Sequence, residues 1–318
     1  MPSNPTGGDV YVQRPLTNFG ERFMQADTSF VSQRAMPILP VERQGDLYWK
    51  VDRGDFWRVQ NTERARSTES GGGGYRESTD SYFAKVYAWH KDNDERDKVN
   101  AASMLSLDSG SVDYVMSILM IDREIKFANA YMDPAKWTTT LNVDWTQPAA
   151  DVVAQFKTAK RTVQLLTGRR PNKLMLGRQA WDTLSDNDSL LSRVSGGATN
   201  AQPAEVNEAL IAGLLELEAI YVMDAVKNNA LEGAADNIEF IGGDNALLYF
   251  APNQVERNGV TAGVGFSWSG LLGSTSNGIR FKRMLAPLLN SERIEGEMAY
   301  DYKIVSADLG YMFTSVSS

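Results

Sequence analysis

Few residues in this chain of 318 could carry out acid–base or metal chemistry. The sequence contains one histidine, His90 in the stretch YAWHKDND, and no cysteine. Histidine is the side chain that most often exchanges protons near neutral pH, and with cysteine it supplies most zinc ligands. Disulfides and thiolate sites are excluded, and a Ser-His-Asp triad or a zinc site has almost nothing to draw on. We expect a structural role for His90, at the end of an aromatic run.

Candidate catalytic motifs fail on their spacing. GFSWSG places Gly265, Ser267, Ser269 and Gly270 close together, but not in the G-x-S-x-G order of a nucleophile elbow. GVTAGVG lacks the strand-then-helix context of a dinucleotide loop, and no G-x-x-x-x-G-K-[ST] phosphate loop occurs. SDNDS resembles half of a calcium loop without its glycine and closing glutamate, so Asp188 is interpreted as a helix cap. We expect no catalytic residue, metal or cofactor.

The bulk composition is that of a globular protein with an acidic balance. Hydrophobic residues make up 42%, charged residues 23%, and the formal net charge is −8. This balance disfavours a protein that grips nucleic-acid phosphates, but it permits one that encloses nucleic acid without sequence-specific binding. No apolar run reaches the length of a membrane helix, and the N-terminal residues show no signal pattern. We therefore expect no membrane partner and synthesis in the cytoplasm.

The most aromatic and most glycine-rich stretches lie together in residues 45–90. LYWKVDRGDFWRVQ and YFAKVYAW are rich in aromatic and β-branched residues, which predicts two strands. The polar stretch between them contains Gly71 to Gly74, which predicts the end of a hairpin, with glycines in the left-handed region. A ribbon roughly 40 Å long is not stable alone, so its aromatics need a partner surface.

Charges along this region are mixed in sign. Residues 41–80 contain seven basic and eight acidic side chains. A solvated hairpin would show such a pattern, and so would a surface that pairs with copies of itself, since a patch of one sign would repel its own copy.

The rest of the chain predicts further helices and strands around this region. Residues 1–44 read as a polar, proline-rich arm. Apolar side chains at helical spacing predict a helix over Ser109–Tyr131, roughly 35 Å long, with Asp108 or Ser109 as its cap. RIEGEMAYDYKIV alternates with period 2, which predicts a strand with one buried face.

From residue 144 the pattern becomes compact and alternates helices with strands. It predicts a helix that ends at Gly168, the buried strand NKLMLG, two short helices in RQAWDTLSDNDSLLSRV, the helix EVNEALIAGLLEL, the strand EAIYVMD and one strand in ADNIEFIGGDNALLYFAP. Arg169 and Arg170 follow the first of these helices. They could complement its dipole or form an ion pair at an interface.

This order of parts resembles the major capsid protein of tailed bacteriophages, the Hong Kong 97 type of fold. IDREIKFANAY looks like the end of the family's spine helix, and TGRRPNKLMLGRQAWDTLSDNDSLLSRV is similar to its central-domain signature. NEALIAGLLELEAIYVMDAVKN matches the following helix and strand, with Asp224, Ala225 and Val226 in the family's "gdav" position, and NALLYFAP matches the next strand. The resemblance covers nearly the whole chain from about residue 40.

The resemblance implies an α+β, Hong Kong 97-like fold in four parts. These are an N-terminal arm (1–44), an extended β-hairpin loop (45–90), a peripheral domain with the spine helix (91–143 and 284–300), and an axial domain (144–283 and 301–318).

It also implies a structural protein and not an enzyme. Such a subunit self-assembles into hexamers and pentamers of an icosahedral shell that encloses double-stranded DNA in the virion, after assembly in the host bacterial cytoplasm. Met1 and the short arm favour a separate scaffolding protein, with a portal and a decoration protein as further partners. The expected inter-subunit contacts are Trp49, Phe56, Trp57, Arg64, Arg66, Gly71, Gly72, Gly73, Gly74, Tyr75, Tyr82, Arg169 and Arg170.

Two alternatives stay open from the residues alone. An encapsulin-like shell that packages a cargo enzyme would have the same fold. An α/β enzyme with an aromatic lid would need acid–base residues that this chain lacks.

Overall fold

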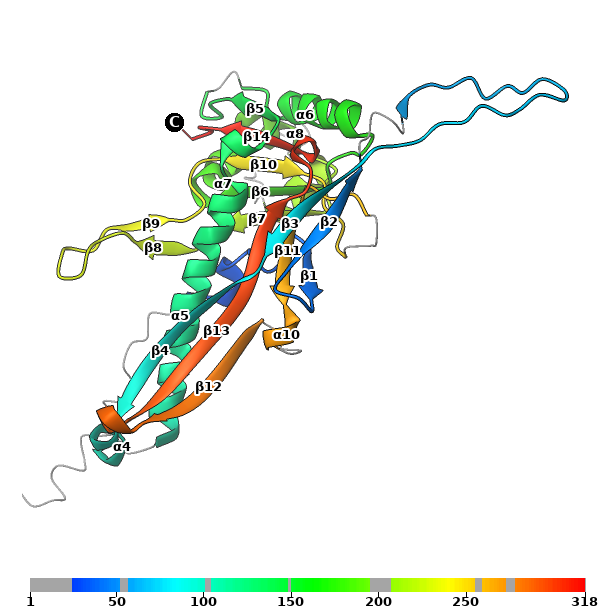
Figure 1. Cartoon of the computed structure of the whole chain (residues 1–318). Coiled ribbons are helices and arrows are strands. Elements are labelled where there is room, and N and C mark those ends of the chain that lie inside the picture. Colours follow the sequence, from blue (N-terminus) through cyan, green and yellow to red (C-terminus); the bar gives the residue numbers. More distant parts are fainter. Residues whose placement is uncertain are drawn as a thin grey trace, which may run out of the picture.

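The computed structural model describes residues 25–51, 57–100, 104–147, 150–194, 207–254, 259–272 and 278–317. A long helix runs beside a long sheet, and a second, compact sheet with its own helices lies at one end (Figure 1). We call them the long sheet and the compact sheet. The expectation of a mixed α+β fold is confirmed.

The long helix is α5 (Met104–Tyr131). Its predicted end at Tyr131 is confirmed, but it starts five residues earlier than predicted. Asp108 is therefore inside the helix and not its cap, and its carboxylate instead forms an ion pair with Arg283. At the expected spacing, Val115, Leu119 and other apolar side chains of α5 are buried.

The long sheet is organised around β13 (Ser291–Ile304), which pairs along both edges. One edge carries β4 (Lys85–Asp94), and the other carries β12 (Ile279–Ala286) and then β11 (Gly263–Trp268). The order continues to β1 (Ile38–Val41), which is parallel to β11. The predicted strand is confirmed, but both of its faces are partly buried because α5 covers one of them.

The compact sheet has the order β5-β14-β10-β6-β7. Its strands are β5 (Thr139–Asn142), β14 (Gly310–Thr314), β10 (Ala246–Tyr249), β6 (Lys173–Gly177) and β7 (Ala219–Met223). The helices packed around it are α6 (Val152–Thr167), α7 (Arg178–Ser185), α8 (Asp188–Val194) and α9 (Glu208–Leu214). The core between them contains Trp145, Phe156 and Phe313, whose rings contact one another at tilted angles.

Most local predictions for this compact part are confirmed. Gly168 ends α6 in the left-handed region with φ of 65°, as a C-terminal glycine commonly does. The cap of α8 is Asn187 and not Asp188, because the Asn187 side chain accepts from the backbone N–H of Ser189. The stretch predicted as one strand around residues 236–252 contains two strands, β9 (Ile238–Phe240) and β10, in different sheets.

Two ribbons lie outside these sheets. β2 (Gly45–Val51) and β3 (Glu77–Phe83) form one, which with residues 57–76 projects far from the body; we call residues 45–51 and 57–83 the extended ribbon (Figure 1). β8 (Val226–Asn228) and β9 form the other, and we call residues 226–240 the second ribbon. Sequence analysis did not predict the second ribbon.

The strand predicted over residues 82–89 breaks at Ala84, where the chain passes from β3 into β4 of the long sheet. Likewise, β11 and β12 belong to the long sheet, although residues 263–283 were grouped with the compact part. The division into arm, loop, peripheral and axial domains stays a prediction, and sheet membership crosses its boundaries at these strands.

Short elements complete the chain. They are α4 (Glu95–Asn100), α10 (Ser269–Leu272) and the 3-10 helices Asp27–Ser29, Pro134–Lys136, Pro287–Leu289 and Ala307–Leu309. Ion pairs connect α4, α5, β12 and β13 at the far end of the long sheet: Lys98 and Arg283 both contact Glu292.

The segment before β1 is held against α5 by a buried carboxylate. Glu124 accepts hydrogen bonds from the backbone N–H groups of Val31 (3.1 Å) and Ser32 (3.0 Å). Burial raises the pKa of Glu124, although the hydrogen bonds from Ser32 and Val31 and the charge of Arg123 oppose the shift. These hydrogen bonds attach the segment around Val31 and Ser32 to α5.

We expect the contribution of Glu124 to the free energy of unfolding to depend on pH. Because its folded-state pKa is raised, the contribution is full below the ordinary value of 4.5 and is lost as the pH rises through the raised pKa. Denaturant unfolding of wild type and Glu124→Gln between pH 4 and pH 8 should show the advantage of wild type shrinking as pH rises. An advantage that grows with pH would contradict this.

A second prediction concerns Gly296 of β13. A Cβ at this position would lie 2.8 Å from Val115 and 2.9 Å from Leu119, so α5 packs directly on the strand backbone. Gly296→Val should therefore lower the free energy of unfolding by at least about 1–3 kcal/mol, the usual cost of overpacking. Glu295→Ala, the neighbouring position on the strand, is the control, and an equal effect of both substitutions would refute the packing argument.

Candidate assembly surfaces

The extended ribbon has two different faces at its root. Because side chains alternate along a strand, Tyr48 of β2 and Tyr82 of β3 share one face. They pack on Phe266 of β11, with ring centroids 5.7 Å and 4.2 Å away respectively. The opposite face carries Leu47, Trp49 and Phe83, all exposed.

This alternation separates two residues that were both expected to contact a neighbouring subunit. The side chain of Trp49 is 69% exposed, whereas that of Tyr82 is 8% exposed. The local partner for part of the ribbon's aromatics is therefore Phe266 of the same chain. The inter-subunit role of Tyr82 stays a prediction, although its own chain covers most of the side chain.

The end of the ribbon differs from the prediction. The chain reverses at residues 65–68, where the N–H of Thr68 donates to the carbonyl of Ala65 (3.3 Å) and Ser67 has φ of 64°. Gly71 to Gly74 lie on the returning arm, and none of them is in the left-handed region. The Thr68 hydroxyl also donates to the carbonyl of Ala65. These two hydrogen bonds stabilise the reversal at residues 65–68, and the chain does not reverse at the glycines.

The glycines instead form a bare, extended stretch. A Cβ added at Gly72, Gly73 or Gly74 would meet nothing within 4 Å in the described structure, and residues 61–79 are exposed. Arg64 folds back to donate to the carbonyl of Thr68 (2.6 Å), and Arg66 lies in the turn itself. Among the described residues, this part of the ribbon is therefore open to solvent.

One aromatic side chain connects the ribbon to the compact part. The ring of Trp57 lies on the backbone of Gly168 at the end of α6, and a Cβ there would be 2.9 Å from the ring. Trp57 remains half-exposed, and Val59 and Tyr75 further along are exposed as well. Phe56, another expected contact, lies outside the described residues.

Arg169 and Arg170, also expected at an interface, have partners within the chain. Arg170 forms an ion pair with Glu216, and the guanidinium of Arg169 lies 5.9 Å from the centre of the Phe250 ring. Both arginines are nevertheless exposed at the surface. Their role at an interface stays a proposal.

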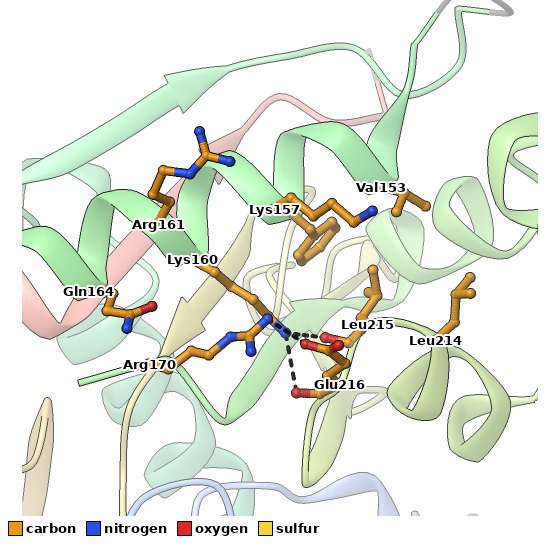
Figure 2. A pocket seen from close by; sticks show the side chains of 10 residues that line it. Val153, Lys157, Lys160, Arg161, Gln164, Arg170, Leu214, Leu215 and Glu216 are labelled. Carbon is orange, nitrogen blue, oxygen red and sulfur yellow. Dashed lines mark hydrogen bonds and ion pairs between the residues drawn. The ribbon is translucent and has the colours of Figure 1, made fainter. Parts of the chain in front are cut away.

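A pocket that sequence analysis missed lies between α6 and the turn after α9 (Figure 2). It has a volume of about 380 Å³. Its lining combines apolar side chains with four cations and a single acid; we call it the basic pocket. The lining residues are Val153, Phe156, Lys157, Lys160, Arg161, Gln164, Arg170, Leu214, Leu215 and Glu216. The helical spacing of Lys157, Lys160, Arg161 and Gln164 was the available signal.

Lys160 forms the floor of this pocket. Its ammonium group is buried and donates to the carbonyls of Leu215 and Glu216, as Figure 2 shows. Burial, with the nearby charge of Arg170, lowers the pKa of Lys160 to about 8. In the described part of the chain, neither Lys157 nor Arg161 has an ion-pair partner, and both side chains are exposed.

Metal clusters and membrane-spanning helices are not found among the described residues. They contain no group of three or more His, Asp or Glu side chains that could hold a metal ion. No helix in the described ranges is long and apolar enough to cross a membrane. His90 lies on β4, exposed and opposite Glu295 of β13, where it is part of a strand and not of a cleft.

Comparison with known proteins gives two phage relatives. No protein-family model matches the chain. The major capsid protein of Pseudomonas phage JBD67 is 23% identical over 294 residues, which cover 89% of this chain and 90% of that protein. The major capsid protein of Burkholderia phage BcepMu is 24% identical over 251 residues, with coverage of 75% and 76%.

Solved structures share the fold over nearly the full length. A phage-related protein from Bordetella bronchiseptica has a TM-score of 0.66 at 20% identity, covering 91% of this chain and 93% of its own. The capsid of cyanophage P-SCSP1u gives 0.59 at 9% identity, with 94% and 92% covered. The SrpI encapsulin of Synechococcus elongatus gives 0.56 at 12% identity, with 100% and 97% covered. The chain thus has the Hong Kong 97-type capsid fold, and its sequence is similar to major capsid proteins of phages.

Proposed function

We propose that this protein is the major capsid subunit of a phage head, a structural protein and not an enzyme. The observation that carries the proposal is sequence similarity to a phage major capsid protein over 89% of this chain and 90% of that protein. The fold shared with solved phage capsids agrees with it. A subunit of this kind resides in the virion.

The exposed face of the extended ribbon explains how copies would hold together. Leu47, Trp49, Trp57, Val59, Tyr75 and Phe83 expose apolar surface that the described chain does not cover. Burial of such surface against a neighbour contributes about 25 cal/mol per Å². Further along the ribbon lie Arg64, Arg66 and Gly71 to Gly74. They are exposed, so a neighbouring subunit could contact them without displacing other parts of their own chain.

The finer features of the assembly follow the family pattern. The subunits form hexamers and pentamers of an icosahedral shell, assembled in the bacterial cytoplasm with a separate scaffolding protein and closed by a portal. A decoration protein is a further partner. The net charge of −8 suits a shell that encloses double-stranded DNA without binding its sequence.

An encapsulin-like compartment is the alternative with the same fold. Its support is the structural likeness to an encapsulin at 12% identity, which concerns the fold alone. The sequence relatives at 23% and 24% identity are both phage major capsid proteins, so we favour the phage head.

Electron microscopy of the purified, concentrated full-length chain tests the shell function. We expect closed or partly closed particles hundreds of ångströms across, with or without co-expressed scaffolding protein. Particles that contain double-stranded DNA after phage production would support the head, and particles that contain a cargo enzyme would support the compartment. A chain that stays monomeric under both conditions would refute the shell function.

Trp49→Ala tests the extended ribbon. Because Trp49 is exposed in the subunit, its removal should change subunit stability by less than about 0.5 kcal/mol. In the shell, where it would be buried, the loss should be at least about 2 kcal/mol per contact. Thermal scans of subunits and of particles measure the two effects.

Leu165→Ala is the matched control, because Leu165 of α6 is also exposed but lies off the ribbon. Shells of Trp49→Ala as stable as those of the control would show that the ribbon face does not bind a neighbour.

A further inference from the structure

The second ribbon is an ordered arm. Its strands pair from Val226 with Phe240 to Asn228 with Ile238. Beyond them, Asn228 accepts from the N–H groups of Ala230 and Asn237, each at 3.0 Å. The Gln25 side chain both donates to and accepts from the backbone of Val226, at 2.7 and 2.9 Å. The ribbon therefore leaves the body in a fixed direction (Figure 1).

The surface of this arm is both acidic and apolar. Leu231 and Ile238 are 84% and 65% exposed, and Phe240 is exposed as well. The acids are Glu232, Asp236 and Glu239, against the single base Lys227, which is already paired with Glu239 (3.3 Å). In the described structure Glu232 has no ion-pair partner. A two-stranded ribbon with this much exposed apolar surface is marginal alone and gains from a partner.

The basic pocket has the complementary surface. Its apolar wall is built by Val153, Phe156, Leu214 and Leu215, and its rim carries Lys157 and Arg161. In a chain with a net charge of −8, this is a local excess of positive charge. An apolar side chain flanked by carboxylates would fit such a wall and rim, since interfaces combine an apolar centre with charges of opposite sign around it.

The two surfaces cannot meet within one subunit as it is built. The second ribbon extends from one side of the compact part, whereas α6, which carries the pocket, lies across another side (Figure 1). Two different patches that bind each other between copies form a head-to-tail contact, and such a contact closes into a ring when the rotation allows. We propose that the second ribbon of one subunit docks into the basic pocket of the next subunit around a capsomer.

This proposal rests on the proposed shell function and adds a specific contact to it. Chemical cross-linking tests it directly, because the wild-type chain contains no cysteine. Leu231→Cys places a thiol on the ribbon, and Lys157→Cys places one at the pocket rim. A short bis-maleimide added to particles of the double variant should give a ladder of linked subunits that ends at five or six chains.

Three controls define the result. Leu231→Cys with Thr158→Cys puts the second thiol on α6 but away from the pocket lining, and should give at most a tenth of the linkage. Leu231→Cys alone should give none, since linkage between two ribbons would mean that they meet each other and not the pocket. Lys157→Cys alone should also give none. Linkage no greater than in the Thr158→Cys control overturns the docking.

Charge reversal gives an independent readout. Glu232→Lys, or Lys157→Glu with Arg161→Glu, should each raise the subunit concentration needed for assembly about tenfold. Combining all three substitutions should restore much of the loss. All three side chains are exposed or line the pocket, so unchanged unfolding midpoints of the subunits would exclude misfolding as the cause. If the variant with all three substitutions assembles no better than the sum of the separate losses predicts, the proposal is overturned.

Together, the cross-linking result and particle formation distinguish failure of the ribbon-to-pocket contact from failure of the shell function. If wild-type chains form particles but particles of the Leu231→Cys, Lys157→Cys variant give no specific linkage, the ribbon-to-pocket contact is refuted and the shell function stays intact. A wild-type chain that forms no particles would refute both.

Discussion

The contact between α5 and the backbone of β13 is the constraint on which the rest of the structure depends. Gly296 allows Val115 and Leu119 to sit directly on the strand, where any side chain would hold the helix away. β13 in turn carries β4 on one edge and β12 and β11 on the other, and β1 follows β11. Nearly every element of the long sheet is thus positioned by one strand and one helix.

The extended ribbon starts from this frame, and the second ribbon, which leaves the compact part, is tied to it. The extended ribbon is anchored where Tyr82 stacks on Phe266 of β11, and the segment before β1 is anchored by Glu124 of α5. That segment also supplies Gln25, which fixes the root of the second ribbon. Two arms therefore project from a packed centre, and both expose apolar side chains, among them Trp49 and Leu231.

Local sequence patterns predicted local structure well. Apolar spacing located α5 and its end at Tyr131, and Gly168 marked the end of α6. One local prediction was wrong: the four glycines predicted the reversal of the extended ribbon, but the chain reverses at the Ala65–Thr68 turn. The second ribbon was missed because its strands are three residues each, too short for a period to show.

By itself the sequence determined which chemistry is absent and which segments seek a partner surface. One histidine and no cysteine limit catalysis, and the aromatic density of residues 45–90 requires burial somewhere. Only the tertiary structure decided which aromatics are already covered, because Tyr82 and Trp49 differ in the face of the ribbon and in the neighbour that each face meets. It also assembled the basic pocket, since Lys157 and Glu216 line one cavity only when α6 packs beside the turn after α9.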